Sequence, residues 1–136
     1  MDYFDVRLPE GQLREMSSLG LAHVGDAVYE LMVRTMLAGR GVETAARLHR
    51  ETVKRVAAPA QAAAAEKMLP LLTDEERDVF RRGRNAKVHG VPSASTDGQY
   101  HEATALEALF GWLWLTGRKE RLCVLFEGMT EEKNAT

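Results

Sequence analysis

The sequence predicts an all-α protein that forms one domain over residues 1–136. No segment alternates apolar and polar residues as a half-buried strand would, and apolar residues recur instead at helical spacing. Thr73 and Thr96 each begin a capping box, in which Glu76 or Gln99 follows at the spacing that satisfies the free N–H groups of a helix start. No internal repeat or linker divides the chain. We therefore expect a single bundle of helices joined by short turns.

The expected helices follow from apolar spacing and from start and stop signals, and they span residues 9–17, 19–37, 44–68, 73–82, 96–117 and 118 onward. Pro9 suits the first position of a helix, whereas Gly39 and Gly41 suit a helix end. Pro59 should kink or split the long segment, whose alanine-rich second half is a strong helix former. Two glycines, a proline and two serines predict a loop over residues 83–97.

Composition describes an ordinary globular chain, with 45% hydrophobic and 28% charged residues. No apolar run approaches the length of a membrane span, and the N-terminus lacks the order of a signal peptide, so we expect a cytoplasmic protein. The lone Cys123 is expected to be a buried structural thiol on the apolar face of the last helix. The net charge of −2 means that any polyanion must bind to a local positive patch.

Two carboxylates stand in apolar helical surroundings. Valine, glycine and alanine flank Asp26, and alanine, leucine and phenylalanine flank Glu107. Such a group must be paired, protonated, metal-bound or exposed. Two such helices in one small domain predict that Asp26 and Glu107 meet and share a divalent cation, with Mg²⁺ favoured because only hard oxygen ligands are offered. The alternative is two surface acids, with Asp26 in a solvated stripe that includes a Glu30–Arg34 pair.

The segment RRGRNAKVH at 81–89 is the densest cationic stretch, and no acid occurs between Val79 and Thr96. Planar guanidinium donors suit phosphate oxygens, and the scarcity of aromatic residues favours the backbone of a duplex over stacked single-stranded bases. The helix over 44–68 carries three more cations that could extend the patch. The candidate RNA-binding residues are Arg81, Arg82, Arg84, Asn85, Lys87, His89, Arg47, Arg50 and Lys54. The alternative is a merely solvated basic surface.

Three motifs together carry a resemblance: GDAVYE at 25–30, RGRNAK at 82–87 and TALEALFG at 104–111. In this order and spacing they resemble the short bacterial Mini branch of the ribonuclease III family, over nearly the whole chain. The resemblance implies an all-helical endonuclease that works as a two-fold homodimer on double-stranded RNA with Mg²⁺ and leaves 5′-phosphate and 3′-hydroxyl ends. In that branch the task is maturing both ends of the 23S ribosomal RNA precursor.

The resemblance also implies roles for single residues, with Asp26 and Glu107 as the catalytic and metal-binding pair. The wider family has further acids four residues before the first and three before the second, where this chain has Ala22 and Thr104. More of the metal's shell must then come from water or RNA phosphate. The residue that packs across the family's dimer interface falls on His23. A ribosomal protein could present the substrate, and the chain ends too early to hold the separate RNA-binding domain of longer relatives.

Two other classes of function provide alternatives. A non-catalytic duplex-RNA-binding module on the same fold would keep the basic segment but would not need both acids, so their joint presence favours an enzyme. An all-α nucleotide pyrophosphohydrolase would also use Mg²⁺, but it would show clustered E-x-x-E and E-x-x-D pairs on facing helices. Here Glu75 with Asp78 is the only candidate pair, and it is better explained by its place at a helix start.

Overall fold

The computed structural model describes residues 1–87 and 96–130. These residues form helices joined by short connecting segments. They are α1 (Glu10–Glu15), α2 (Ser18–Gly39), α3 (Ala45–Val56), α4 (Ala58–Met68), the short 3₁₀ helix η1 (Leu69–Leu71), α5 (Asp74–Arg84), α6 (Asp97–Leu115) and α7 (Lys119–Thr130). The all-α prediction is confirmed. None of the helices within these ranges is long and apolar enough to cross a membrane.

The predicted helix boundaries are confirmed where a side chain defines them. The Thr73 hydroxyl accepts from the Glu76 backbone N–H while the Glu76 carboxylate accepts from the Thr73 N–H, and Thr96 and Gln99 repeat the arrangement at α6. The predicted long helix over 44–68 is split. Its halves, α3 and α4, meet at Ala57, whose extended backbone (ψ 145°) precedes a proline in the first turn of α4.

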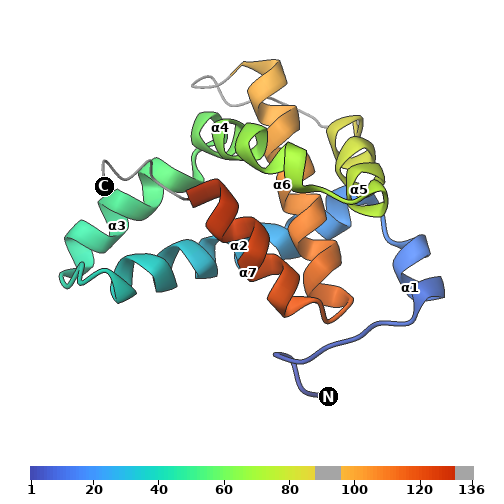
Figure 1. The fold of residues 1–136 in the computed structure, drawn as a ribbon, viewed down its shortest axis with the longest axis horizontal. Helices are drawn as coiled ribbons and strands as arrows, with labels where there is room; N and C mark the ends of the chain where they lie inside the picture. Colours follow the sequence, from blue (N-terminus) through green and yellow to red (C-terminus); the bar gives the residue numbers. More distant parts are fainter. Residues whose placement is uncertain (88–95, 131–136) are drawn as a thin grey trace.

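Helix α6 lies at the centre of the molecule, where it crosses α2 and packs beside α4, α5 and α7 (Figure 1). The crossing is very close because each helix contributes a glycine. A Cβ atom at Gly25 would collide with the carbonyl oxygen of Glu107, and one at Gly111 would collide with that of Leu21. The two backbones therefore touch at this point, so Asp26, which follows Gly25, is held beside the turn of α6 that carries Glu107.

The prediction of a loop from residue 83 is wrong at its first two residues, because α5 continues to Arg84. Gly83 is buried, and a Cβ there would lie 2.9 Å from the Cβ of Ala108 and 3.0 Å from the Cα of Ala105. This glycine therefore serves close helix packing against α6 and does not mark a turn. Residues 88–95 of the predicted loop lie outside the described residues.

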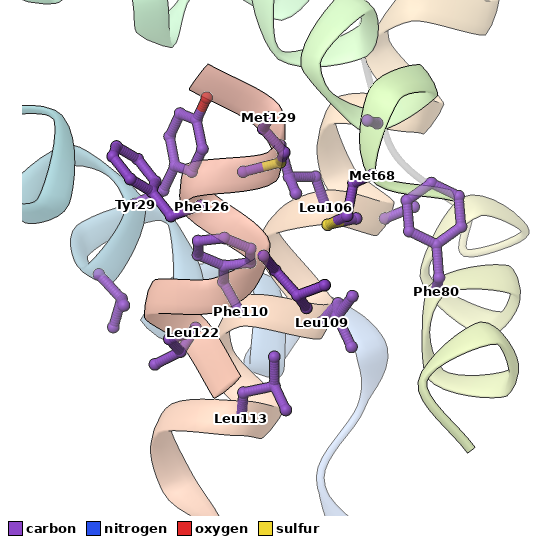
Figure 2. Close-up of a cluster of buried hydrophobic side chains, with 14 of the residues drawn as sticks. Tyr29, Met68, Phe80, Leu106, Leu109, Phe110, Leu113, Leu122, Phe126 and Met129 are labelled. Atoms are coloured by element: carbon purple, nitrogen blue, oxygen red, sulfur yellow. The ribbon is translucent and has the colours of Figure 1, made fainter. Parts of the chain in front are cut away.

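The hydrophobic core gathers around α6 and its neighbours (Figure 2). Tyr29 of α2 packs edge-on against Phe110, with ring centroids 5.5 Å apart, and against Phe126 of α7 at 5.8 Å. The prediction of a buried Cys123 is wrong, since this thiol is exposed. The buried face of α7 consists of Leu122, Leu125, Phe126 and Met129. Cys123 follows Leu122 by one residue, about 100° around the helix, which turns it away from that face.

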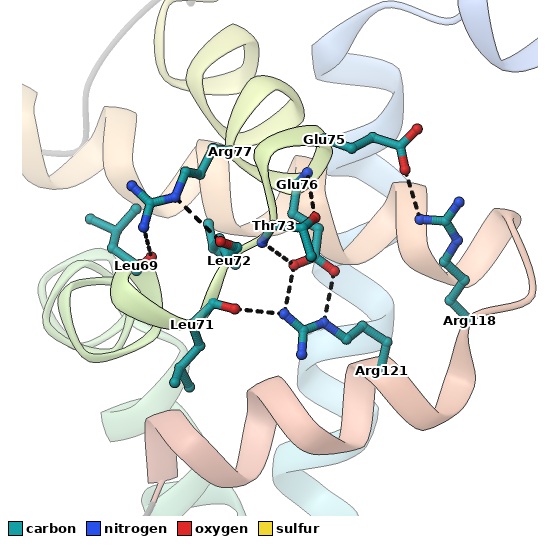
Figure 3. Close-up of polar contacts among 9 residues, drawn as sticks. All are labelled: Leu69, Leu71, Leu72, Thr73, Glu75, Glu76, Arg77, Arg118 and Arg121. Carbon is teal, nitrogen blue, oxygen red and sulfur yellow. Dashed lines mark hydrogen bonds and ion pairs between the residues drawn. The ribbon is translucent and has the colours of Figure 1, made fainter.

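A polar network ties the start of α5 to α7 (Figure 3). Arg121 donates to both carboxylate oxygens of Glu76, at 2.8 and 2.7 Å, and to the carbonyl oxygen of Leu71 at 2.7 Å. Glu76 is only 2% exposed. Burial by itself would raise the pKa of Glu76, but the hydrogen bonds from Arg121 and Thr73 outweigh it and lower that pKa. The acid that caps α5 is thus also the partner that fixes α7.

Candidate active site

The close crossing of α2 and α6 brings together the two acids that the sequence singles out. Asp26 projects from α2 and is exposed, whereas Glu107 projects from α6 and is half-buried. Their carboxyl groups lie within hydrogen-bonding reach of each other. Asp26 is at the surface and the Glu30–Arg34 pair forms at 2.7 Å, as the alternative of two surface acids expected, whereas Glu107 is half-buried beside Asp26.

The proximity of the two acids changes the chemistry of Glu107. Its pKa is raised from 4.5 to about 8, chiefly because the group is buried and also because the Asp26 carboxyl group lies beside it as a like charge and hydrogen-bond partner. Ionisation of both groups is therefore disfavoured unless a cation lies between them. In the absence of a cation, the pair is therefore expected to share one proton near neutral pH.

Gln61 of α4 is the third polar side chain at this point, and the sequence analysis did not identify it. Its amide nitrogen donates to the Glu107 carboxylate at 3.5 Å and to the carbonyl oxygen of Val56, at the end of α3, at 3.1 Å. The side chain is only 2% exposed. A signal was present in the sequence, because Gln61 is the single amide in the run APAQAAAA at 58–65.

The donor set fits a hard divalent cation, since it consists of carboxylate oxygens that repel each other and lacks thiolate or imidazole. Within residues 1–87 and 96–130, no group of three or more His, Cys, Asp or Glu side chains is placed to hold a metal. Ala22 and Thr104, both buried, occupy the positions where the wider family was expected to carry two further acids. A metal bound by Asp26 and Glu107 would thus keep most of its shell for water or substrate oxygens.

The cations at the end of α5 are exposed, but acids from other turns and helices lie near them. Arg81 and Arg82 both pair with Asp78, at 2.6 and 3.2 Å, and Arg84 lies 3.9 Å from Glu102 of α6. The absence of acids within 79–96 therefore does not mean that these arginines lack acidic neighbours. The two pairs with Asp78 are exposed and contribute little free energy, so phosphates can replace them, whereas the Glu102 side chain is only 14% exposed. Asn85 ends the helix, Lys87 is exposed, and His89 lies outside the described residues.

The cations of α3 do not extend this patch. Arg47, Arg50 and Lys54 are exposed, and Lys54 pairs with Glu51 at 2.9 Å. Figure 1 shows α3 and α5 toward opposite ends of the long axis of the molecule, with α2, α4 and α6 between them. The two basic groups are therefore separate surfaces, on either side of the helices that carry the acid pair.

Comparison with known proteins agrees with this arrangement. The ribonuclease III domain family matches residues 19–118. Curated relatives named Mini-ribonuclease 3 include one from Symbiobacterium thermophilum, 44% identical over 83% of this chain and 87% of its own. Another, from Enterococcus faecalis, is 40% identical over 88% and 97% of the two chains, and one from Gloeobacter violaceus is 47% identical over 84% and 82%.

A solved structure supports the same assignment at the level of the fold. A protein from Fusobacterium nucleatum superposes with a TM-score of 0.76 at 30% sequence identity, over 85% of this chain and 93% of that one. The matched family segment begins in α2 and ends just after α6, so it contains the close crossing and both acids. The chain belongs to the ribonuclease III family, within its Mini-ribonuclease 3 branch, and is an endoribonuclease.

Proposed function

We propose that Asp26 and Glu107 are the catalytic, Mg²⁺-binding residues of an enzyme that cleaves double-stranded RNA. The observation that carries this proposal is the meeting of two carboxyl groups from different helices at a glycine-lined crossing, with the pKa of Glu107 raised to about 8. A divalent cation would relieve the repulsion that raises this pKa. A pKa perturbed in this way, by burial and a specific charged partner, is typical of functional sites.

The residues have separate tasks in the proposed reaction. A Mg²⁺ ion held by Asp26 and Glu107 would activate a water molecule and stabilise the charge that develops on the phosphate. Asp26 is exposed and so would be accessible to RNA, whereas half-buried Glu107 anchors the site to the central helix. Both acids would have to be ionised to hold a cation, so metal binding at Glu107 would compete with its proton. Hydrolysis on the side of the 3′-oxygen leaves 5′-phosphate and 3′-hydroxyl ends.

The expected substrate is the 23S ribosomal RNA precursor, in a cytoplasmic protein whose residues 1–136 act as one catalytic domain. This proposal rests on the resemblance to the Mini branch and on the names of the relatives. The basic end of α5 and the cations of α3 would grip the phosphates of the duplex, with Arg81, Arg82, Arg84, Asn85, Lys87, His89, Arg47, Arg50 and Lys54 as candidate contacts. No feature of the described residues favours a ribosomal protein as a further partner.

The decisive test removes one carboxylate at a time. Asp26→Asn and Glu107→Gln keep the size of each side chain but remove a charge that a metal requires. We expect each variant to lose at least about 100-fold in cleavage of duplex RNA at saturating Mg²⁺. Duplex binding and helical content should stay close to those of the unmodified protein. Near-normal cleavage by either variant would exclude that residue as a metal ligand. Comparing precursor ribosomal RNA with a uniform duplex tests the substrate separately.

A self-associating surface is available for the proposed homodimer. Leu31 is 51% exposed and Phe4 is 69% exposed, and both line a shallow cavity of about 340 Å³ together with His23, Val24, Ala27, Val28 and Trp114. This apolar surface lies on α2, the helix that carries Asp26. A two-fold contact here would bury it and place two acid pairs in one particle, as cutting both strands of a duplex requires.

The dimer can be tested with matched charge substitutions. Leu31→Lys puts a cation in the apolar surface, whereas Val124→Lys changes an equally exposed apolar residue (53%) on α7, outside that surface. In sedimentation at micromolar concentration we expect the unmodified protein and Val124→Lys to be dimers and Leu31→Lys to be a monomer. Because both positions are half exposed, neither change should disturb the fold. A monomeric unmodified protein would contradict paired cuts on opposite strands.

A further inference from the structure

Gln61 is an unusual residue for the place that it occupies. It is 2% exposed at the start of α4, where alanines fill most neighbouring positions. Its amide has two donor hydrogens and an acceptor oxygen, and burying them costs free energy unless they are hydrogen-bonded. The oxygen Oε1 finds no donor among the described residues. An apolar side chain of similar volume would fill this space at a lower cost, so packing alone does not explain a glutamine here.

The surroundings of the amide fix its orientation. The two groups that it contacts, the Val56 carbonyl oxygen at 3.1 Å and the Glu107 carboxylate oxygen Oε2 at 3.5 Å, are both acceptors. Only the nitrogen can face them, because a flipped amide would place its oxygen against both. Gln61 is thereby locked with its N–H groups toward Glu107, anchored on the end of α3, and the unsatisfied oxygen is the cost of that orientation.

This contact acts on the buried member of the acid pair. Glu107 comes from α6, Asp26 from α2 and Gln61 from α4, so three helices converge on one carboxyl group. The amide N–H donates to one oxygen of Glu107, Oε2, while the same nitrogen is anchored on the Val56 carbonyl oxygen, so the contact restrains the orientation of the carboxyl group. Groups that hydrogen-bond to a ligating carboxylate orient it and tune its affinity for the metal.

We propose that Gln61 is a positioning residue, which holds the carboxyl group of Glu107 in the orientation that binds the divalent cation. The inference rests on the proposed function, because it assumes that Glu107 is a ligand. Gln61 does not touch RNA or the metal in this role, since its side chain is buried and its N–H groups face Glu107 and the end of α3.

The test replaces the amide without emptying its space. Gln61→Met keeps the length and approximate volume of the side chain but removes both donors. We expect the binding of Mg²⁺ and of Mn²⁺ to the RNA-free protein, measured by calorimetry, to weaken about tenfold. The Mg²⁺ concentration for half-maximal cleavage should rise by a similar factor. KM for duplex RNA should stay unchanged, and Tm without metal should stay equal or rise.

Controls separate this role from a structural one. Thr52→Val removes a hydroxyl that is 4% exposed on α3, and we expect it to leave metal affinity unchanged. If Gln61→Met lowers Tm but binds metal normally, Gln61 only joins α3 to α4 and the proposal is overturned. Should that variant fail to fold, Gln61→Asn provides the same test, because it keeps the amide but draws its nitrogen back from Glu107. Normal metal binding by Gln61→Asn would then overturn the proposal.

The same experiment separates a failure of the proposed metal site from a failure of the proposed role of Gln61. Asp26→Asn and Glu107→Gln should abolish metal binding in the same calorimetric experiment. If they do and Gln61→Met does not weaken it, the acid pair stands and only the role of Gln61 fails. If neither acid variant changes metal binding, the proposed metal site fails, and with it the role of Gln61.

Discussion

At the scale of single residues, Glu107 links stability to pH in the metal-free protein. Its pKa is about 8 in the fold but is expected near 4.5 in the unfolded chain, so the folded state binds the extra proton between these values. The free energy of unfolding is therefore undiminished below about pH 4.5. It falls as the pH rises from there through 8, where Glu107 also ionises in the folded state. Relief of this effect is one reason for a cation to bind.

The variant Glu107→Gln should remove that pH dependence, because an amide has no proton to lose. In a chelator, we expect its Tm to exceed that of the unmodified protein by roughly 5 °C or more at pH 8, and by much less at pH 5. Mg²⁺ should raise the Tm of the unmodified protein at pH 8 but not that of the variant. Parallel Tm curves against pH for the two proteins would show that Glu107 does not titrate as described.

At the scale of helices, the crossing of α2 and α6 depends on having no side chain at Gly25. Replacing Gly25 with alanine forces a methyl group into the Glu107 carbonyl oxygen, a backbone atom that cannot turn away. We expect a loss of about 1–3 kcal/mol or more in the free energy of unfolding, measured with urea. Cleavage should also fall, because α2 must move and carry Asp26 away from Glu107.

Gly39 provides the matched control on the same helix. A Cβ there meets nothing within 4 Å, and its backbone is helical, so Gly39→Ala should change stability by no more than about 0.5 kcal/mol and leave cleavage intact. Equal effects of the two substitutions would mean that helix propensity, and not the close crossing, decides the result at Gly25.

At the scale of the whole molecule, a net charge of −2 leaves RNA binding to local groups of cations. If Arg84 and Lys87 contact phosphates, the double alanine variant should flatten the slope of log affinity against log salt by about one to two units, for all duplex sequences alike. Turnover at saturating RNA should fall less than affinity. The mostly buried Glu102 carboxylate lies 3.9 Å from Arg84, and RNA phosphates would compete with it for the exposed guanidinium group.

The second basic surface is tested in the same way and independently. Alanine at Arg47 and Arg50 should flatten the slope by a similar amount, because α3 lies apart from α5 and would grip other phosphates (Figure 1). Arg14→Ala on α1, where the cation pairs with Glu10 at 3.6 Å, is the control and should leave the slope unchanged. An unchanged slope for one pair of variants would assign the grip to the other surface.

The sequence by itself determined the helical class, the capped starts of α5 and α6 and the split near Pro59. It also singled out two acids in apolar helical surroundings, Asp26 and Glu107. These features are local. Capping boxes, a proline and helical spacing each act within a few residues, so they can be recognised without knowing what packs against them. The family resemblance could also be recognised from the sequence, because each of its motifs is an unbroken run of residues.

Only the tertiary structure decided what each local feature is used for. Gly83 was expected in a loop but lies inside α5. Cys123 was expected in the core but is exposed. Gln61 was overlooked in an alanine-rich run, although its amide donates to Glu107. The raised pKa of Glu107 likewise requires Asp26 from a helix 81 positions earlier in the chain. Burial, close approach and electrostatic coupling depend on distances in space, and residues far apart in sequence acquire those distances only when the helices pack.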